Sequence, residues 1–240
     1  MSNAKLEYEG RTYPIRLHKE WRESVKYSLG SKYLTIRVPK FIPNFMTDYH
    51  IEEAKNWAIT QVKKRSENTE KVIKRAYVDQ GTFTIRDQVF KLSIKEENRK
   101  SFSGKMQQGK ILIKAPKGHV GDRESLAKLM SRLMAGHFHE NFCNAVHHLN
   151  KLHFQEDINK IRLKNNRSNW GSCSSDKNLN FSTRLLFAPF EVIKYVIVHE
   201  LAHLKEMNHS PAYWAIVEEV MPEYKEMEKW LSDYNHLCHF

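Results

Sequence analysis

Two histidines and a glutamate between residues 199 and 203 have the types and spacing that bind a metal and activate water. His199 and His203 are separated by one helical turn, so on an α-helix their imidazoles project from the same face. This pair can bind one Zn²⁺, and the carboxylate of Glu200 would then lie beside the metal and act on a bound water. His209 follows shortly afterwards and is the candidate third ligand. Three protein ligands with an open fourth position are typical of a catalytic zinc site rather than a structural one.

The same short pattern also fits an ordinary amphipathic helix whose two histidines bind no metal. The flanking sequence distinguishes between these interpretations. Residues 190–198, which lead into the pattern, place apolar side chains around most of a helix, as a buried helix does. Pro189 suits the first turn of such a helix. Ionisable side chains in a buried helix need partners, and a metal ion is a suitable one. The flanking sequence therefore favours metal binding.

The segment between the second and third histidines has the composition of a helix end followed by a new helix. Asn208 tolerates the left-handed backbone conformation, so we expect it to end the helix directly before His209. Ser210 and Pro211 are typical of an N-cap and a first helical position. We therefore expect His209 in a tight corner between two helices.

Short motifs between Ile161 and Leu231 follow, in order and spacing, those of a known protein family. They are Asn169-Trp170-Gly171-Ser172-Cys173-Ser174, Leu179-Asn180, Arg184-Leu185, Ala188-Pro189, Tyr195-Val196, His199 to Leu204, Asn208-His209-Ser210, Trp214, Pro222-Glu223-Tyr224 and Trp230-Leu231. On these residues the chain resembles the YgjP-like family of metal-dependent hydrolases, relatives of the SprT-type zinc proteases. The resemblance implies a zincin-like catalytic domain with Zn²⁺ on His199, His203 and His209, and with Glu200 as the general base.

The resemblance also implies which residues border the substrate. It suggests that the strand with Trp170, Gly171 and Ser172 lies beside the site, where an edge strand can take up an extended peptide. Gly171 would allow another backbone to approach closely. Arg184 and Tyr213 are near the histidine motif in sequence, and either is a candidate for stabilising a developing oxyanion. We count Trp170, Gly171, Ser172 and Arg184 as the candidate substrate-binding residues.

The first half of the chain contains an internal repeat at an offset of 77 residues, which predicts a duplicated fold. Residues 13–40 align without a gap to residues 90–117, and the apolar matches keep the two-residue period of half-buried strands. Gly30-Ser31 and Gln107-Gln108-Gly109 fall where a hairpin is expected to turn. Each copy is therefore expected to form a small, twisted antiparallel sheet.

Each predicted sheet runs into a predicted helix. The first helix is expected from Thr47 to Arg65, and the second from an N-cap at Asp122 towards Leu149. The zincin-like domain implied by the resemblance needs a helix behind the histidine helix, and the second helix is the candidate for it. We therefore expect this helix both to close the second repeat and to open the catalytic domain.

The predicted fold class is α+β, with two tandem antiparallel sheet-plus-helix repeats before a zincin-like catalytic domain that contains the HExxH helix. The repeats are expected within residues 5–120, at about 5–76 and 80–120, each followed by its helix. The catalytic domain is expected at residues 121–240. A chain of 240 residues is long enough for this arrangement.

Composition narrows the partners and the compartment. The net charge of +11 favours anionic partners such as nucleic acid, nucleotide phosphates or an acidic surface, although a generally basic protein is an equal alternative. Three cysteines without paired spacing indicate a reducing compartment and no disulfide framework. Neither a signal-peptide pattern nor a membrane-length apolar run occurs in the sequence. We expect a cytoplasmic protein that does not interact with a membrane.

The predicted function is metal-assisted hydrolysis, in which zinc lowers the pKa of a bound water and Glu200 accepts its proton. The leading hypothesis is a metalloprotease that acts on polypeptides, including polypeptides associated with nucleic acid. The first alternative is a nucleoside triphosphate (UTP) pyrophosphatase, an activity attributed to some YgjP-like proteins, although the sequence has neither a P-loop nor an acidic cluster for Mg²⁺. The second alternative is a non-enzymatic binding module in which zinc is structural.

Overall fold

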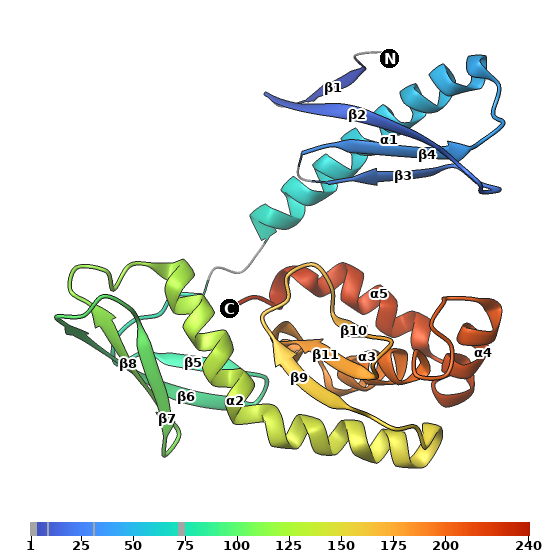
Figure 1. Cartoon of the computed structure of the whole chain (residues 1–240). Coiled ribbons are helices and arrows are strands. Elements are labelled where there is room, and N and C mark those ends of the chain that lie inside the picture. The colour runs from blue at the N-terminus through green and yellow to red at the C-terminus, as the bar shows by residue number, and fades with distance from the viewer. Residues whose placement is uncertain (1–3, 9, 31, 72–74) are drawn as a thin grey trace. The chain divides into compact units, whose positions relative to one another are not determined.

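The computed structural model describes residues 4–8, 10–30, 32–71 and 75–240 (Figure 1). The chain divides into two compact units, Met1–Lys71 and Val72–Phe240. Within these described ranges no helix is both long and apolar enough to cross a membrane.

The first unit is a four-stranded sheet followed by one long helix. The strands are β1 (Lys5–Tyr8), β2 (Arg11–Glu20), β3 (Lys26–Leu29) and β4 (Leu34–Pro39), arranged in the order β1-β2-β4-β3, and the helix is α1 (Asn44–Lys71). Alternate residues of β4 are fully buried against α1, whose Ala54 and Ala58 are also fully buried. The predicted helix over Thr47–Arg65 lies inside α1 and is confirmed.

The second unit begins with a copy of this sheet. Its strands are β5 (Thr82–Ile85), β6 (Gln88–Glu97), β7 (Ser103–Gln107) and β8 (Lys110–Pro116), in the equivalent order β5-β6-β8-β7. Ile15 pairs with Leu34 in the first sheet, and the residues 77 positions later, Leu92 and Ile111, pair in the second. The duplication is therefore preserved down to the register of the strands.

The direction of one strand pair differs from the prediction. The pairs β2–β4 and β6–β8 are parallel, whereas the neighbouring pairs are antiparallel, so the prediction of fully antiparallel sheets is wrong for the central pair. In each copy the third strand passes to the outside of the sheet, and the fourth strand returns between it and the second. Apolar alternation has the same period in either direction, so the sequence pattern could not distinguish these arrangements.

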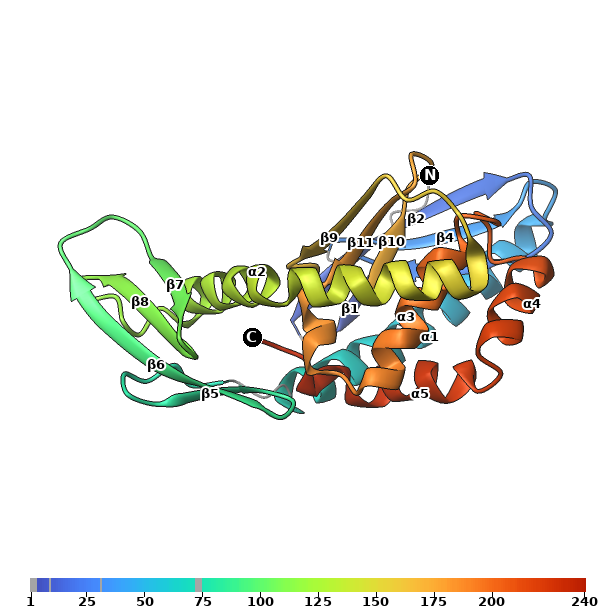
Figure 2. The ribbon, with the colours of Figure 1, turned by 90° about the horizontal axis from the view of Figure 1, so that it is seen from below.

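Helix α2 (Arg123–Leu149) connects two hydrophobic cores of the second unit (Figure 2). Asp122 caps it as predicted, because its side chain accepts a 3.1 Å hydrogen bond from the backbone N–H of Ser125. The first half of α2 packs on the β5–β8 sheet, and Phe142, Val146 and Leu149 in its second half pack with the elements that follow it in the chain. The predicted boundary between residues 120 and 121 thus falls inside one compact unit, just before a helix that both cores share.

The remaining elements form the C-terminal part of the second unit. They are the π-helical turn η1 (Asn150–Phe154), strands β9 (Lys160–Lys164), β10 (Gly171–Cys173) and β11 (Asn178–Ser182), the 3-10 helix η2 (Thr183–Phe187), helices α3 (Phe190–Ala202), α4 (Pro211–Val220) and α5 (Tyr224–Tyr234), and the 3-10 turn η3 (Asn235–Leu237). The sheet order is β10-β11-β9, so β10 is an edge strand. Helix α3 is apolar on most sides and is buried in this core, as expected. The α+β fold class is confirmed.

Candidate metal centre and active site

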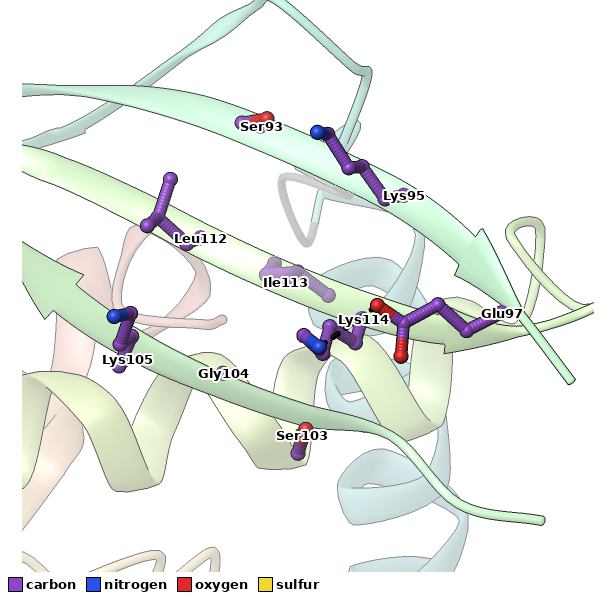
Figure 3. A pocket seen from close by; sticks show the side chains of 9 residues that line it. All are labelled: Ser93, Lys95, Glu97, Ser103, Gly104, Lys105, Leu112, Ile113 and Lys114. Carbon is purple, nitrogen blue, oxygen red and sulfur yellow. Dashed lines mark ion pairs between the residues drawn. The ribbon is translucent and has the colours of Figure 1, made fainter. Parts of the chain in front are cut away.

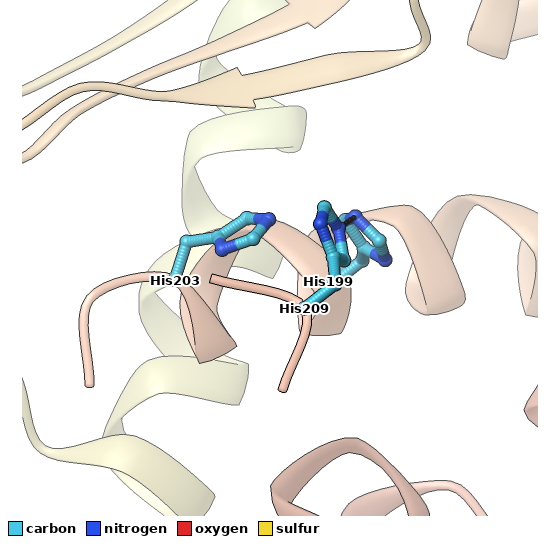
Figure 4. A group of neighbouring side chains, drawn as sticks. All are labelled: His199, His203 and His209. Carbon is cyan, nitrogen blue, oxygen red and sulfur yellow. Dashed lines mark hydrogen bonds between the residues drawn. The ribbon is translucent and has the colours of Figure 1, made fainter. Parts of the chain in front are cut away.

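The three predicted metal ligands come together at the end of α3. His199 lies in the last turn of α3, His203 follows that helix directly, and His209 lies in the loop before α4. One nitrogen from each of the three side chains can be chosen so that all lie within 4.8 Å of one another (Figure 4). The Nε2 atoms of His199 and His209 are 3.2 Å apart. Side chains from a helix and from the loop that follows it therefore converge on one point.

The chain reaches His209 by a different route from the one expected. Helix α3 ends at Ala202, and the residues that follow form a turn, so the predicted helix end at Asn208 is wrong. Asn208 is also not among the described residues with positive φ. The early end gives the carbonyl of Glu206 a direct role, because it lies 3.1 Å from Nδ1 of His203. The backbone after the helix therefore orients a ligand, which an Asn-terminated helix would not have done.

The corner on the other side of His209 is built as predicted. The side chain of Ser210 accepts a 3.2 Å hydrogen bond from the backbone N–H of Tyr213, and Pro211 occupies the start of α4. This cap fixes the direction in which α4 leaves the loop. His209 is thereby held between a turn and a capped helix.

Hydrogen bonds at the outer ring nitrogens turn the two α3-derived histidines towards the site. Nδ1 of His203 faces the carbonyl of Glu206, and Nδ1 of His199 lies 3.4 Å from the hydroxyl of Tyr195. That hydroxyl donates a 2.9 Å hydrogen bond to Oε1 of Glu228, so its oxygen is free to accept from His199. These contacts favour the tautomers with hydrogen on Nδ1, which leaves both Nε2 atoms available to a metal.

Tyr213 contacts both His199 and His203. Its ring is fully buried and stacks on His203 with the ring centroids 4.5 Å apart. Its hydroxyl donates a 2.9 Å hydrogen bond to the backbone carbonyl of His199, which lies in the last turn of α3. Because that proton is already used, the geometry gives Tyr213 a positioning role rather than the oxyanion role considered from the sequence.

The carboxylate of Glu200 is buried, and a buried carboxylate needs a hydrogen-bond donor or a cation as its partner. The residue is 4% exposed, and its Oε2 atom has no hydrogen-bond partner in the part of the chain that the structure describes. Burial raises the pKa of this carboxyl to about 8. A buried carboxylate beside three imidazoles is the setting expected of a general base next to a cation.

The protonation of the histidines also suits a metal. Burial lowers the pKa of His199 to about 3, with a further contribution from the neighbouring His203 and His209. Burial likewise lowers the pKa of His203. Neutral imidazoles are the form that ligates metals, and three of them with one nearby carboxylate match a catalytic zinc site. The residues present therefore fit a divalent metal such as Zn²⁺.

The site opens into a hollow of about 250 Å³ whose wall includes the edge strand β10. It is lined by Gly171, Ser172, Cys173, His199, Glu200, His203, Met207 and His209. Gly171 and Ser172, two of the candidate substrate-binding residues, are therefore placed at the site. A Cβ on Gly171 would lie only 2.3 Å from Oε1 of Glu200. The strand backbone thus packs directly on the carboxylate.

The other two candidate substrate-binding residues do not line the hollow. Arg184 is 4% exposed, and its guanidinium donates to the carbonyls of Cys238 and Arg167 at 2.9 Å each, and to the side chain of Asn235. It also lies 4.2 Å above the ring of Trp170. These contacts hold the C-terminal segment against the catalytic sheet. The geometry therefore supports a packing role for both residues in place of substrate binding.

Tyr195 and Glu228 connect to the histidine cluster, and neither was assigned to the site from the sequence. Tyr195 is one helical turn before His199, so helical spacing alone could have suggested their contact. Glu228 lies on α5, and nothing in its local sequence connects it to the histidines. Met207 was also not assigned, although it lines the hollow from the loop between the second and third ligands.

The chain is similar to a curated protein and to solved structures of metallopeptidase zymogens. A UTP pyrophosphatase of Escherichia coli (strain K12) is 28% identical over 85 residues, which are 35% of this chain and 51% of that protein. The chain thus matches about half the length of this curated relative. The crystal structure of the metallopeptidase zymogen of Pyrococcus abyssi abylysin is 22% identical, with a TM-score of 0.37, over 40% of this chain and 97% of that one. The zymogen of Methanocaldococcus jannaschii jannalysin is 25% identical, with a TM-score of 0.33, over 38% and 92%.

A family model covers most of the chain. The model of the YgjP-like metallopeptidase domain matches residues 23–234, which include all three histidines and Glu200. The match also includes part of the first sheet and all of the second. A metallopeptidase family implies a divalent metal and supports a hydrolase, in agreement with the ligand set described above. The chain therefore belongs to the YgjP-like metallopeptidase family.

Proposed function

We propose that this protein is a zinc-dependent peptidase in which Glu200 is the general base. One observation carries the proposal. The carboxylate of Glu200, buried and with an unpartnered oxygen, shares a small hollow with three converging imidazoles and the backbone of an edge strand. The proposed general base, the proposed metal ligands and the edge strand that could bind a peptide thus line the same hollow.

The residues divide the work of the reaction. When bound by His199, His203 and His209, Zn²⁺ supplies a Lewis acid that polarises a carbonyl oxygen and acidifies water. Glu200 accepts the proton of the attacking water and later delivers it to the departing amine. Tyr195 and the carbonyl of Glu206 keep the two α3-derived imidazoles in the tautomer and orientation that ligation needs.

The edge strand supports a peptide as the substrate. In its sheet β10 pairs with β11 on one side only, so its other edge can accept backbone hydrogen bonds from an extended chain. Gly171 lies at the start of this strand and carries no side chain that would separate the incoming backbone from Glu200. A peptide added to β10 would therefore pass directly beside the carboxylate and the histidines.

A nucleoside triphosphate pyrophosphatase is the second candidate, because one relative carries the name UTP pyrophosphatase. The basic net charge of the chain is compatible with it. The hollow itself is less favourable, since none of the described residues that line it is a lysine or arginine. A triphosphate there would depend on the metal for charge neutralisation, whereas a peptide would not.

A structural zinc is a weaker explanation of the same site. Structural zinc sites usually have four protein ligands. Among the described residues, the cluster of possible ligands contains three histidines and no fourth member. Together with the unpartnered oxygen of Glu200, this favours an open position at the metal.

The proposal is tested by offering both substrates to the same zinc-loaded protein. Unfolded casein and UTP are assayed in parallel with wild type, with Glu200→Gln, and with Glu191→Gln as a control on the exposed first turn of α3. We expect casein cleavage that falls by about 10²- to 10⁴-fold in Glu200→Gln, the usual contribution of a general base, and that is unchanged in the control. Zinc content should stay the same in all three proteins. Cleavage of UTP alone, lost in Glu200→Gln, would replace the peptidase by the second candidate, and full activity of Glu200→Gln would remove Glu200 as the base.

A further inference from the structure

The outer face of the β5–β8 sheet, on the side away from α2, is covered by lysines. Ile94, Ile111 and other buried residues of this sheet pack towards α2, so the residues that alternate with them point outwards. Five outward residues are exposed lysines: Lys91 and Lys95 on β6, Lys105 on β7, and Lys110 and Lys114 on β8. Figure 3 shows Lys95 on β6 and Lys105 on β7, the strands on either side of β8, in a hollow of about 450 Å³.

These lysines are arranged so that they oppose one another. Lys91 is the cross-strand partner of Lys110, and Lys95 is the partner of Lys114. Like charges directly opposite each other destabilise a sheet, so this pattern is not explained by the needs of the fold. The acid that lines this hollow, Glu97, is already engaged, at 2.8 Å from Lys114. The face therefore presents an excess of positive charge.

A second basic hollow, of about 770 Å³, lies between the loop that joins β6 to β7 and the first turns of α2. Its lining includes Arg99, Lys100, Lys128 and Arg132, and it continues the chain segments that line the first hollow. Its acid, Asp122, is engaged in capping α2 through the backbone and hydroxyl of Ser125. Two of the basic side chains are paired as well, Arg99 with Glu97 at 3.8 Å and Lys128 with Glu124 at 3.0 Å. Lys100 and Arg132 are exposed and add positive charge at this second hollow.

Because the sheet is duplicated, the positive charge of its outer face can be compared between the two copies. On the outer face of the first sheet, Lys26 and Ser28 of β3 correspond to Ser103 and Lys105 of β7, each 77 residues later. The lysine has moved by two positions along the strand, which keeps it on the same face. Arg37 and Lys114 likewise occupy equivalent positions. The two copies thus share a basic outer face although the individual residues differ, as expected of a surface that acts through its charge.

We propose that the outer face of the β5–β8 sheet, together with the second hollow, binds the phosphate backbone of nucleic acid. Lysines act on phosphates as mobile point charges and do not read bases, so the binding is independent of sequence. Phe102 and His119 are the described residues with aromatic rings in these two hollows, and no row of stacking platforms is present. This surface is distinct from the histidine site, and its function does not depend on the peptidase activity.

The experiment measures fluorescence anisotropy of labelled single-stranded and duplex oligonucleotides with the full-length, zinc-loaded protein at increasing salt. We expect affinity that falls steeply with salt and differs little between sequences of one strand type. Replacing Lys95, Lys100 and Lys105 together by glutamate should weaken binding at least tenfold. It should also reduce the salt slope by about 3, roughly one for each lost phosphate contact. The milder replacement of the same lysines by glutamine should act in the same direction and excludes misfolding as the cause.

A matched control separates this surface from the overall charge. Lys151, Lys160 and Lys229 are exposed lysines on η1, β9 and α5, and replacing them by glutamate changes the net charge by the same amount. Equal loss of binding in both triple variants would overturn the proposal. The proposal would also be overturned if polyglutamate or anionic phospholipid vesicles bound as tightly as the oligonucleotides and did so through Lys95, Lys100 and Lys105. Casein cleavage and zinc content should be the same in both triple variants as in wild type. Failure at this surface is thereby distinguishable from failure of the proposed peptidase.

Discussion

Gly171 and Glu200 are in such close contact that a single added carbon at residue 171 would collide with the carboxylate. A Cβ there would lie 2.3 Å from Oε1 and 2.6 Å from Cγ of Glu200. Gly171 begins the edge strand β10, and Glu200 lies on the buried side of α3. The position of the proposed base is therefore set by the backbone of the strand that would bind the substrate.

Gly171→Ala should displace Glu200 and reduce peptide hydrolysis by about 10²-fold, the effect expected of a reacting group misplaced by about 1 Å. Zinc content should remain, because the three atoms nearest to the added methyl group all belong to Glu200 and not to a histidine. Gly121→Ala is the control, since a Cβ at that position meets no atom within 4 Å. Steady-state kinetics and metal analysis of both variants check this, and a Gly171→Ala variant as active as the control would show that the contact does not position the base.

Tyr195→Phe should weaken zinc binding by about tenfold, within the range observed when groups that orient metal ligands are removed. The variant keeps the ring but removes the hydroxyl that connects Nδ1 of His199 to Glu228. Glu228→Gln should have a smaller effect in the same direction, since its amide oxygen can still accept the hydrogen bond from Tyr195.

The measurement for this prediction is competition for zinc with a chromogenic chelator. Tyr234→Phe is the control, because Tyr234 is an exposed tyrosine at the end of α5. A zinc affinity of Tyr195→Phe equal to that of this control would mean that the ring packing alone orients His199.

The cluster of three histidines and the helix that leads into it could be predicted from the sequence because they depend on local spacing. His199, Glu200 and His203 lie within one helical turn, and the Ser210-Pro211 start of α4 is encoded by its own two residues. The duplication was predictable for a similar reason. Each strand buries one face, so its apolar residues alternate in the sequence, and the same alternation recurs in both copies.

The parts that could not be predicted depend on contacts between residues far apart in the chain. Arg184 has the chemistry of a substrate-binding residue, and only its contacts with Cys238 and Asn235 show that it holds the C-terminal segment. Similarly, Glu228 is indistinguishable in sequence from other acids of an amphipathic helix until α5 packs on α3. The end of α3 at Ala202 was also not predicted, although the contact found there is local, because the carbonyl of Glu206 lies 3.1 Å from Nδ1 of His203.

The C-terminal segment should make the stability of the fold depend on pH through His239. Burial lowers the pKa of His239 to about 4, and the nearby guanidinium groups of Arg184, Arg167, Arg75 and Arg123 act in the same direction. In the unfolded chain this histidine returns to its ordinary pKa of about 6.5. Between these two values the unfolded chain binds a proton that the folded protein does not, so the free energy of unfolding falls as the pH falls from about 6.5 to about 4.

His239→Gln should remove this contribution, because glutamine is neutral in both states at every pH in this range. The free energy of unfolding, measured by urea denaturation at pH 7.5, 5.5 and 4.5, should therefore fall less steeply towards acid in the variant than in wild type. His148→Gln, at an exposed position near the end of α2, should keep the slope of wild type. Comparing variants at each pH also cancels proton-linked changes that they share, including those at the three metal-binding histidines. Parallel curves for His239→Gln and wild type would show that His239 is protonated equally in the folded and unfolded chain, and that the arginines around it leave its proton affinity unchanged.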